Sequence, residues 1–268
     1  MKKAICFLMA FLVLLLPNVI YADAGGHGDN EASTPVIDMG TKETPTVFDP
    51  ENELINKKKT EAALELRILE LKTSYTANVT VYPQIVGYYC GPASAYMVIK
   101  SWGFNVPSTT RSLSFFNGCP ANCPYPSTPH TCYQSYTSPQ VTLADSMNVG
   151  YAGADFIQLK NEINARISLD YYSYQNITTL TQLRTAFAVP LNGGHPNLVW
   201  IYANKLPRYS TTSFGGHYVV GYSYNTTTDT MRLADPHYLP NYCGQYVVTE
   251  SQLLNAMQRS NGAANILW

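Results

Sequence analysis

The chain has 268 residues, of which 46% are hydrophobic and only 13% are charged, whereas a typical soluble domain carries about 25% charged residues. This composition excludes intrinsic disorder, which needs low hydrophobicity and a high net charge. A formal net charge of −1 argues against a nucleic-acid-binding protein, because such proteins gain most of their affinity by neutralising phosphates with Lys and Arg.

The first residues have the layout of a secretory signal peptide. Lys2 and Lys3 precede an apolar run over residues 4–16, and a stretch of small residues follows. The run is shorter than the roughly 20 residues that a membrane-spanning helix needs, so an uncleaved anchor is the less favoured alternative. The 21 Tyr residues also indicate a hydroxyl-rich surface typical of exported proteins. We expect residues 1–24 to be removed, which leaves a secreted or cell-surface bacterial protein without a stable membrane anchor.

Two segments of different character follow. Residues 25–50 are rich in Gly, Pro, Asp, Thr and Asn without apolar periodicity, which predicts a linker. Residues 51–75 are crowded with Glu and Lys, and Leu64, Ile68 and Leu71 recur at spacings of four and three, which predicts a charged amphipathic helix. This helix either packs one stripe on the rest of the chain or acts as a pro-segment that covers an active site until it is removed.

A cysteine opens the next predicted helix. The helix follows Cys90, because Pro92 suits a first helical turn and Gly103 suits a C-cap. The positive end of the helix dipole favours the thiolate, which is the nucleophilic form of cysteine. Gly91 lets the backbone come close to a substrate, and the side-chain amide of Gln84 can lie beside the same reacting carbonyl as an oxyanion donor.

The number of cysteines favours a thiol at Cys90 over a half-cystine. Loss of Cys6 with the signal peptide leaves five cysteines, and an exported protein normally pairs an even number. The other four lie in loops: Cys119, Cys123, Cys132 and Cys243. They can form two disulfides, and all three connectivities remain open. His130 beside Cys132 permits a zinc site as the alternative, but an oxidising compartment favours disulfides. We expect no metal and no cofactor.

The remaining elements predict an α+β fold. A helix is expected over residues 155–166. Strands are expected over residues 198–202, 217–224, 230–234 and 246–249, with residues 225–229 as a polar turn between two of them. Helices that precede an antiparallel sheet are typical of this class.

A nucleophilic cysteine needs a base, and one of the five histidines is placed differently from the others. His217 follows Gly215 and Gly216 at the start of a buried strand, where small residues leave room for a thiol. The other four lie in the linker, in the cysteine-rich loop, in a turn and after a proline: His27, His130, His195 and His237. A core histidine with a satisfied hydrogen bond is the alternative interpretation of His217.

An aspartate lies eighteen residues after this histidine. Asp235 ends the strand that pairs with the His217 strand, so it can return to the level of His217 and orient the imidazole. The alternative is a turn-forming Asp before Pro236. Only seven acidic residues occur after residue 75, and this scarcity favours a functional role.

These segments together resemble the papain-like cysteine peptidases, most closely the stand-alone exported relatives of the bacteriocin-processing C39 peptidases. The matching segments are Gln84, Tyr89-Cys90-Gly91-Pro92-Ala93, Gly216-His217-Tyr218-Val219-Val220-Gly221-Tyr222 and Ala234-Asp235-Pro236. The resemblance covers about residues 82–256. It implies a papain-like catalytic domain over residues 76–268 that acts on a peptide or protein. It also implies Cys90 as nucleophile, His217 as general base and acid, Asp235 as orienting residue and Gln84 as oxyanion donor.

The resemblance leaves the substrate open. The C39 peptidases of bacteriocin exporters precede a membrane and ATPase region and cut leaders in the cytoplasm, whereas this chain carries a signal peptide and ends after the peptidase-like region. The Cys119 to Cys132 insertion is outside the family pattern and is interpreted as a lid or specificity loop.

Three functions are compatible with these residues. The first is an exported cysteine peptidase that forms a thioester at Cys90. The second is a non-catalytic exported binding protein whose tyrosine-rich loops contact a partner through Tyr88, Tyr89, Tyr171, Tyr172 and Tyr174. The third is a transpeptidase or transglutaminase-like acyl transferase. All four catalytic residue types are present, which favours an enzyme.

Overall fold

The chain folds around one antiparallel sheet. The computed structural model describes residues 49–65, 73–114, 133–210, 212, 214–259 and 261–268. The predicted signal peptide, nearly all of the predicted linker and three of the loop cysteines (Cys119, Cys123 and Cys132) lie outside these residues, as do His27 and His130. No helix in the described part is long and apolar enough to cross a membrane.

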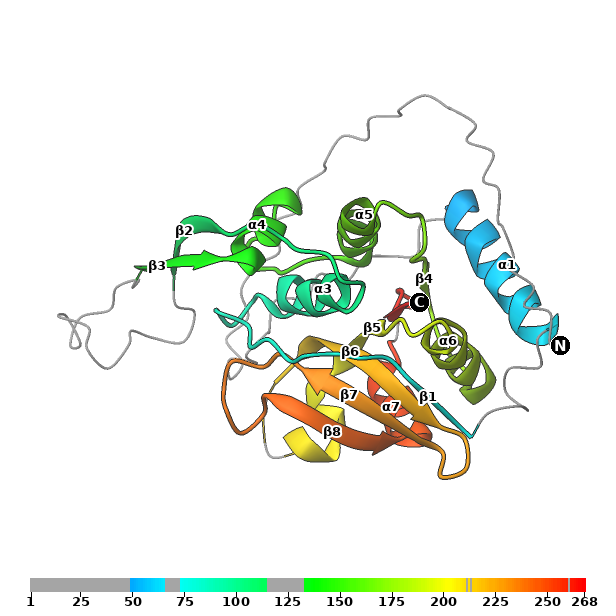
Figure 1. Cartoon of the computed structure of the whole chain (residues 1–268). Helices are drawn as coiled ribbons and strands as arrows, with labels where there is room; N and C mark the ends of the chain where they lie inside the picture. Colours follow the sequence, from blue (N-terminus) through cyan, green and yellow to red (C-terminus); the bar gives the residue numbers. More distant parts are fainter. Residues whose placement is uncertain (1–48, 66–72, 115–132, 211, 213, 260) are drawn as a thin grey trace, which may run out of the picture. The chain divides into compact units, whose positions relative to one another are not determined.

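Within the described residues, seven strands form the main sheet, in the order β4-β9-β5-β6-β7-β8, with β1 paired to the last part of β6 (Figure 1). The strands are β1 (Ser74–Thr76), β4 (Tyr174–Gln175), β5 (Asn197–Tyr202), β6 (Gly216–Asn225), β7 (Thr230–Asp235), β8 (Gly244–Thr249) and β9 (Ile266–Leu267). The four longer strands of the C-terminal half are those expected from the sequence. The turn between β6 and β7 is also confirmed, because the Asn225 side chain accepts hydrogen bonds from the amides of Thr227 and Thr228.

Helices cover both faces of the sheet. Leu198 and Trp200 of β5 pack in one cluster with α3 (Cys90–Ser101), α4 (Pro139–Ser146) and α5 (Phe156–Ile167). Val199 and Ile201 pack in a second cluster with α6 (Leu180–Asn192) and α7 (Glu250–Met257). Alternate residues of the strand therefore face opposite helical layers, as the period of two requires. Each large apolar side chain buried in this way contributes about 1.5–3 kcal/mol.

Most of these helices begin with a side-chain cap. Asp155 caps α5 together with Gln158, so the helix expected over residues 155–166 is confirmed. Thr179 and Gln182 form the same capping box at α6, and Thr249 and Gln252 form it at α7. The helix α3 differs, because its N-cap residue Tyr89 makes no side-chain hydrogen bond to the first turn.

A separate two-stranded sheet precedes α4. Strand β2 (Thr109–Ser114) pairs antiparallel with β3 (Tyr133–Ser138). Residues 115–132, which carry three of the predicted disulfide cysteines, therefore begin and end at the strands of this hairpin.

The chain between β5 and β6 forms two short 3-10 helices, η1 (Ala203–Lys205) and η2 (Pro207–Tyr209).

The described part of the helix α1 (Pro50–Glu65) docks through polar side chains. Leu64 of the predicted apolar stripe is 74% exposed, and the other two residues of that stripe, Ile68 and Leu71, lie outside the described residues. Asn56 donates to the carbonyl of Tyr174 at 3.0 Å, and its oxygen accepts bonds from Ser173 and from the Trp268 indole, each at 2.8 Å. The side-chain donor and acceptor of Asn56 are both used, so these hydrogen bonds hold α1 in one position against β4.

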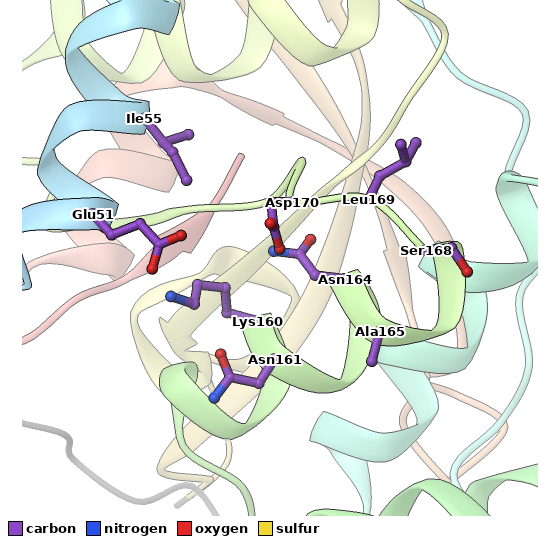
Figure 2. A pocket seen from close by; sticks show the side chains of 9 residues that line it. All are labelled: Glu51, Ile55, Lys160, Asn161, Asn164, Ala165, Ser168, Leu169 and Asp170. Carbon is purple, nitrogen blue, oxygen red and sulfur yellow. The ribbon is translucent and has the colours of Figure 1, made fainter. Parts of the chain in front are cut away.

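The place of α1 bears on the pro-segment interpretation. Strand β4, which α1 contacts, is separated from β6 by β9 and β5. Figure 2 shows Glu51 and Ile55 of α1 facing Lys160 of α5 across a hollow of about 370 Å³. The described part of this segment therefore packs on the edge of the sheet at β4. Tyr172 and Tyr174 are buried in this region, which corrects the idea that they form a binding face.

Candidate active site

The start of α3 places Cys90 against the sheet. Cys90 is the first residue of the helix and is 0% exposed. The hydroxyl of Ser94, one turn later, donates to the carbonyl of Tyr218 on β6 at 3.1 Å. A Cβ added to Gly91 would lie 2.9 Å from the Cβ of Ala154. Gly91 therefore serves close packing of α3 on its neighbours, a reason that sequence analysis did not find.

The first turn of α3 presents backbone amides ahead of Cys90. The first helical bond between backbone groups is donated by Ala93 to the carbonyl of Tyr89 at 2.9 Å, and Pro92 carries no N–H. The amides of Cys90 and Gly91 precede this bond, at the end of the helix that carries its positive partial charge. An anion that forms next to Cys90 is stabilised in this position.

The ends of two strands bring His217 and Asp235 together. Val220 of β6 pairs with Ala234 of β7, which returns Asp235 to the level of the first residues of β6. Nε2 of His217 lies 2.7 Å from Oδ1 of Asp235, and both side chains are 0% exposed. The predicted contact between this histidine and this aspartate is present.

The carboxylate of Asp235 has two further hydrogen-bond donors. The Tyr209 hydroxyl donates to Oδ2 at 2.6 Å, and the backbone N–H of His237 donates to Oδ1 at 2.9 Å. Burial raises the pKa of Asp235, but the positive charge of His217 and these hydrogen bonds outweigh it and hold the pKa below its usual value. Asp235 is therefore ionised at neutral pH.

The second ring nitrogen of His217 is left for Cys90. Nδ1 is buried, and the Cys90 side chain interacts with the ring of His217. Burial lowers the pKa of His217, but the Asp235 carboxylate and then the nearby Cys90 thiol outweigh it and raise the pKa above its ordinary value. An imidazole that holds its proton at neutral pH can stabilise a thiolate beside it.

Gln84 lies next to the end of β7. Its backbone N–H donates to the carbonyl of Pro236 at 2.6 Å. Its side-chain amide donates to the carbonyls of Val86 and Gly87 at 3.0 and 2.8 Å, and its side-chain oxygen is buried without a partner in the described part of the chain. The predicted oxyanion donor thus holds the loop that leads to Cys90.

Tyr209 and His237 are functional candidates that sequence analysis missed. Burial lowers the pKa of His237 to about 3, so this ring is neutral beside the charged pair. His237 lies only two residues after Asp235, which was a usable signal, whereas nothing in the spacing of Tyr209 pointed to Asp235. His195 stacks on Trp102 with ring centroids 3.4 Å apart, so it is a packing residue.

The remaining site predictions concern cysteines and metals. Cys243 is a thiol whose pKa is raised by burial and by Asp235. Its predicted disulfide partners lie outside the described residues, so the pairing stays a prediction. Among the described residues, no group of three or more His, Cys, Asp and Glu side chains is arranged to hold a metal ion.

Two solved structures are similar to this chain. Among solved structures, a fragment of prointerpain A from Prevotella intermedia is similar, with a TM-score of 0.43 and 13% identity over 84% of this chain and 85% of that one. Xylellain, a cysteine protease from Xylella fastidiosa, is similar with a TM-score of 0.40 and 12% identity over 85% of this chain and 94% of that one. No curated protein shows significant similarity.

The sequence profile of the Peptidase_C39 like family matches residues 76–262, which is most of the chain. The match includes the helix that begins with Cys90 and the strands that carry His217 and Asp235. The expected α+β arrangement, with the cysteine helix packed on an antiparallel sheet that carries the histidine and the aspartate, is confirmed. The chain belongs to the peptidase C39-like family and is a cysteine peptidase.

Proposed function

We propose that the protein is exported and hydrolyses peptide bonds with Cys90 as nucleophile, His217 as general base and acid, and Asp235 as the residue that orients His217. The observation that carries this proposal is the 2.7 Å contact between Nε2 of His217 and Asp235, which directs Nδ1 away from the carboxylate. The influence of Cys90 on the pKa of His217 supports a thiol at that nitrogen.

The first half of the reaction forms a thioester. The Cys90 thiol gives its proton to Nδ1 of His217, and the thiolate attacks the carbonyl carbon of the scissile bond. The tetrahedral intermediate collapses, the C–N bond breaks, and the imidazolium gives its proton to the leaving amine. The ionised Asp235 stabilises the imidazolium throughout, and this contribution fits its lowered pKa.

The second half consumes water. His217 takes a proton from a water molecule, whose oxygen attacks the thioester carbonyl. The C–S bond breaks, the acid product leaves, and the sulfur recovers its proton from His217. The enzyme therefore returns to its initial state, and one water is consumed for each peptide bond.

Backbone amides at the start of α3 would hold the oxyanion in both halves. The amide of Cys90 is at the positive end of the helix, and Tyr89 places no side-chain cap over it. Gln84 would join it by exchanging one of its two loop acceptors, the carbonyls of Val86 and Gly87, for the substrate oxygen. Cys90, His217 and Asp235 are each 0% exposed, so side chains around Cys90 must move before a substrate carbonyl reaches the sulfur.

Export rests on the N-terminal sequence. Lys2 and Lys3 followed by the apolar run of residues 4–16 support passage through a secretory route. N-terminal sequencing of the protein recovered from the culture medium or the cell surface of a bacterial host tests this. A mature protein that begins near residue 25 is expected, and recovery only from the cytoplasm with Met1 in place would contradict it.

Hydrolysis by the full mature chain tests the mechanism. Digests of unstructured proteins should show cleavage that Cys90→Ala and His217→Ala abolish, while circular dichroism shows that both variants remain folded. Full cleavage by folded Cys90→Ala would overturn the proposal. Incorporation of an added amine into the products instead of water would favour an acyl transferase. Absence of any covalent or hydrolytic chemistry would favour a binding protein.

A further inference from the structure

A small cavity lies immediately beside the residue that precedes Cys90. It has a volume of about 150 Å³ and is lined mainly by Tyr88, Tyr89, Arg111, Leu113, Tyr133 and Tyr151. Tyr89 is the N-cap residue of α3, so one wall of the cavity is a single residue away from the nucleophile. Arg111, Leu113 and Tyr133 come from the β2–β3 hairpin, whose strands flank residues 115–132.

The lining of this cavity is aromatic. The ring of Tyr88 packs on Tyr89 with centroids 5.1 Å apart and on Tyr151 with centroids 5.0 Å apart. Tyr151 and Tyr133 leave 52% and 65% of their surface exposed at the rim. Exposed tyrosines that gather at one hollow are typical of recognition surfaces. A cavity of about 150 Å³ is large enough to accept a benzene ring.

The polar groups at this cavity are engaged with one another. The Tyr89 side chain is 0% exposed, and its hydroxyl interacts with the Arg111 guanidinium, which lowers the pKa of Tyr89 against the larger rise caused by burial. Arg111 is also bonded to Asp145 at 2.6 Å, which neutralises the charge at this edge of the cavity. An uncharged aromatic ring therefore fits the cavity better than a charged side chain does.

We infer that this cavity is a subsite for an aromatic side chain of the peptide substrate next to the scissile bond. The inference rests on the proposed function, because it assigns the occupant from the position of the cavity beside Cys90. The substrate ring contacts the exposed rings of Tyr133 and Tyr151. The neutral rim gives no preference for a charged side chain.

Hydrolysis of matched peptides that differ at a single residue beside the scissile bond tests the subsite. Peptides with Tyr or Phe at this residue should be cleaved with kcat/KM about tenfold or more above those with Ala. Tyr151→Ala should remove about tenfold from the Tyr peptides and leave the Ala peptides nearly unchanged. Phe104→Ala, an aromatic side chain with 40% exposure outside the cavity, is the matched control and should change neither.

A binding measurement separates this inference from the peptidase mechanism. Folded Cys90→Ala should bind the Tyr peptide more tightly than the Ala peptide by calorimetry, and the added Tyr151→Ala change should remove the difference. Cleavage that depends on Cys90 without aromatic preference would overturn the subsite and leave the mechanism in place. Preferential binding without cleavage by the unmodified chain would support the subsite and overturn the mechanism. Absence of both the aromatic preference and the cleavage would overturn the subsite and the mechanism together.

Discussion

The Tyr209 hydroxyl donates to Oδ2 of Asp235 at 2.6 Å, on the carboxylate oxygen that His217 does not use. Tyr209 is 0% exposed, and its hydroxyl acts on the reaction through Asp235. It is therefore a positioning residue. Its bond fixes the carboxylate plane and lowers the pKa of Asp235.

Replacing Tyr209 with Phe should lower kcat about 10- to 100-fold, the worth of a hydrogen bond to a charged group, with little change in KM. Loss of the bond raises the pKa of Asp235, so the acidic limb of kcat/KM should move to higher pH. Tyr242→Phe is the matched control, because its ring stacks on Tyr209 with centroids 4.7 Å apart. An unmoved acidic limb in folded Tyr209→Phe would show that the hydroxyl only supports packing.

Asp235→Asn separates the charge of this residue from its orienting role. An asparagine oxygen can still accept the bonds from His217 and from the His237 amide, but the attraction that raises the pKa of His217 is lost. Activity needs the imidazolium and is lost as the pH rises through the pKa of His217, so the alkaline limb should shift to lower pH. Asp235→Ala should lower kcat more, because it removes the acceptors for His217 and for the His237 amide as well as the charge. An alkaline limb identical to that of the unmodified protein would contradict the assigned role of the carboxylate.

Gly91→Ala should disturb the position of Cys90. Its new Cβ would lie 2.9 Å from the Ala154 Cβ, so α3 must shift, at a cost of about 1–3 kcal/mol of unfolding free energy. The companion change Ala154→Gly removes the clash and should restore both stability and kcat. Gly87→Ala is the control, since its nearest neighbour, the Tyr238 ring, lies 3.9 Å away. A Gly91→Ala protein with unchanged denaturant midpoint would contradict the packing role.

Asn56→Ala tests the docking of α1. The change removes bonds to Tyr174, Ser173 and Trp268 and leaves buried partners unsatisfied, which costs about 1–3 kcal/mol in unfolding free energy. Lys58→Ala, on the exposed side of the same helix, should have nearly no effect. Activity per folded molecule should stay constant. A rise in activity when α1 is weakened would favour the pro-segment interpretation.

Sequence analysis predicted the longer elements of the fold better than the short ones. Strands β5 to β8 and helices α3 and α5 could be predicted, because their apolar runs are long and bounded by clear turn and cap residues. Strands β1, β4 and β9 have only two or three residues, and they exist through pairing with distant strands. Helix α6 escaped because Pro190 lies in its last turn.

The misjudged features depend on contacts that no spacing encodes. Leu64, Ile68 and Leu71 suggested an apolar face for this helix. The described part, α1, is held by Asn52 and Asn56, which both donate to the backbone carbonyl of Tyr174 on β4. Tyr209 reaches Asp235 from a 3-10 helix twenty-six residues earlier. Order and spacing sufficed to predict that His217 and Asp235 lie together, because they lie on paired strands. They also placed Cys90 at the start of a helix that packs on the same sheet.

The most direct test of the central claim is the rate of iodoacetamide alkylation at each cysteine, measured by peptide mass spectrometry on the native protein between pH 5 and 9. We predict that Cys90 reacts faster than Cys243 at pH 6, although Cys90 is the more buried. The reason is that His217 stabilises the Cys90 thiolate, while burial and Asp235 raise the pKa of Cys243. The same advantage should disappear in His217→Ala. A Cys90 rate at pH 6 no greater than that of Cys243, and unchanged by His217→Ala, would contradict the account.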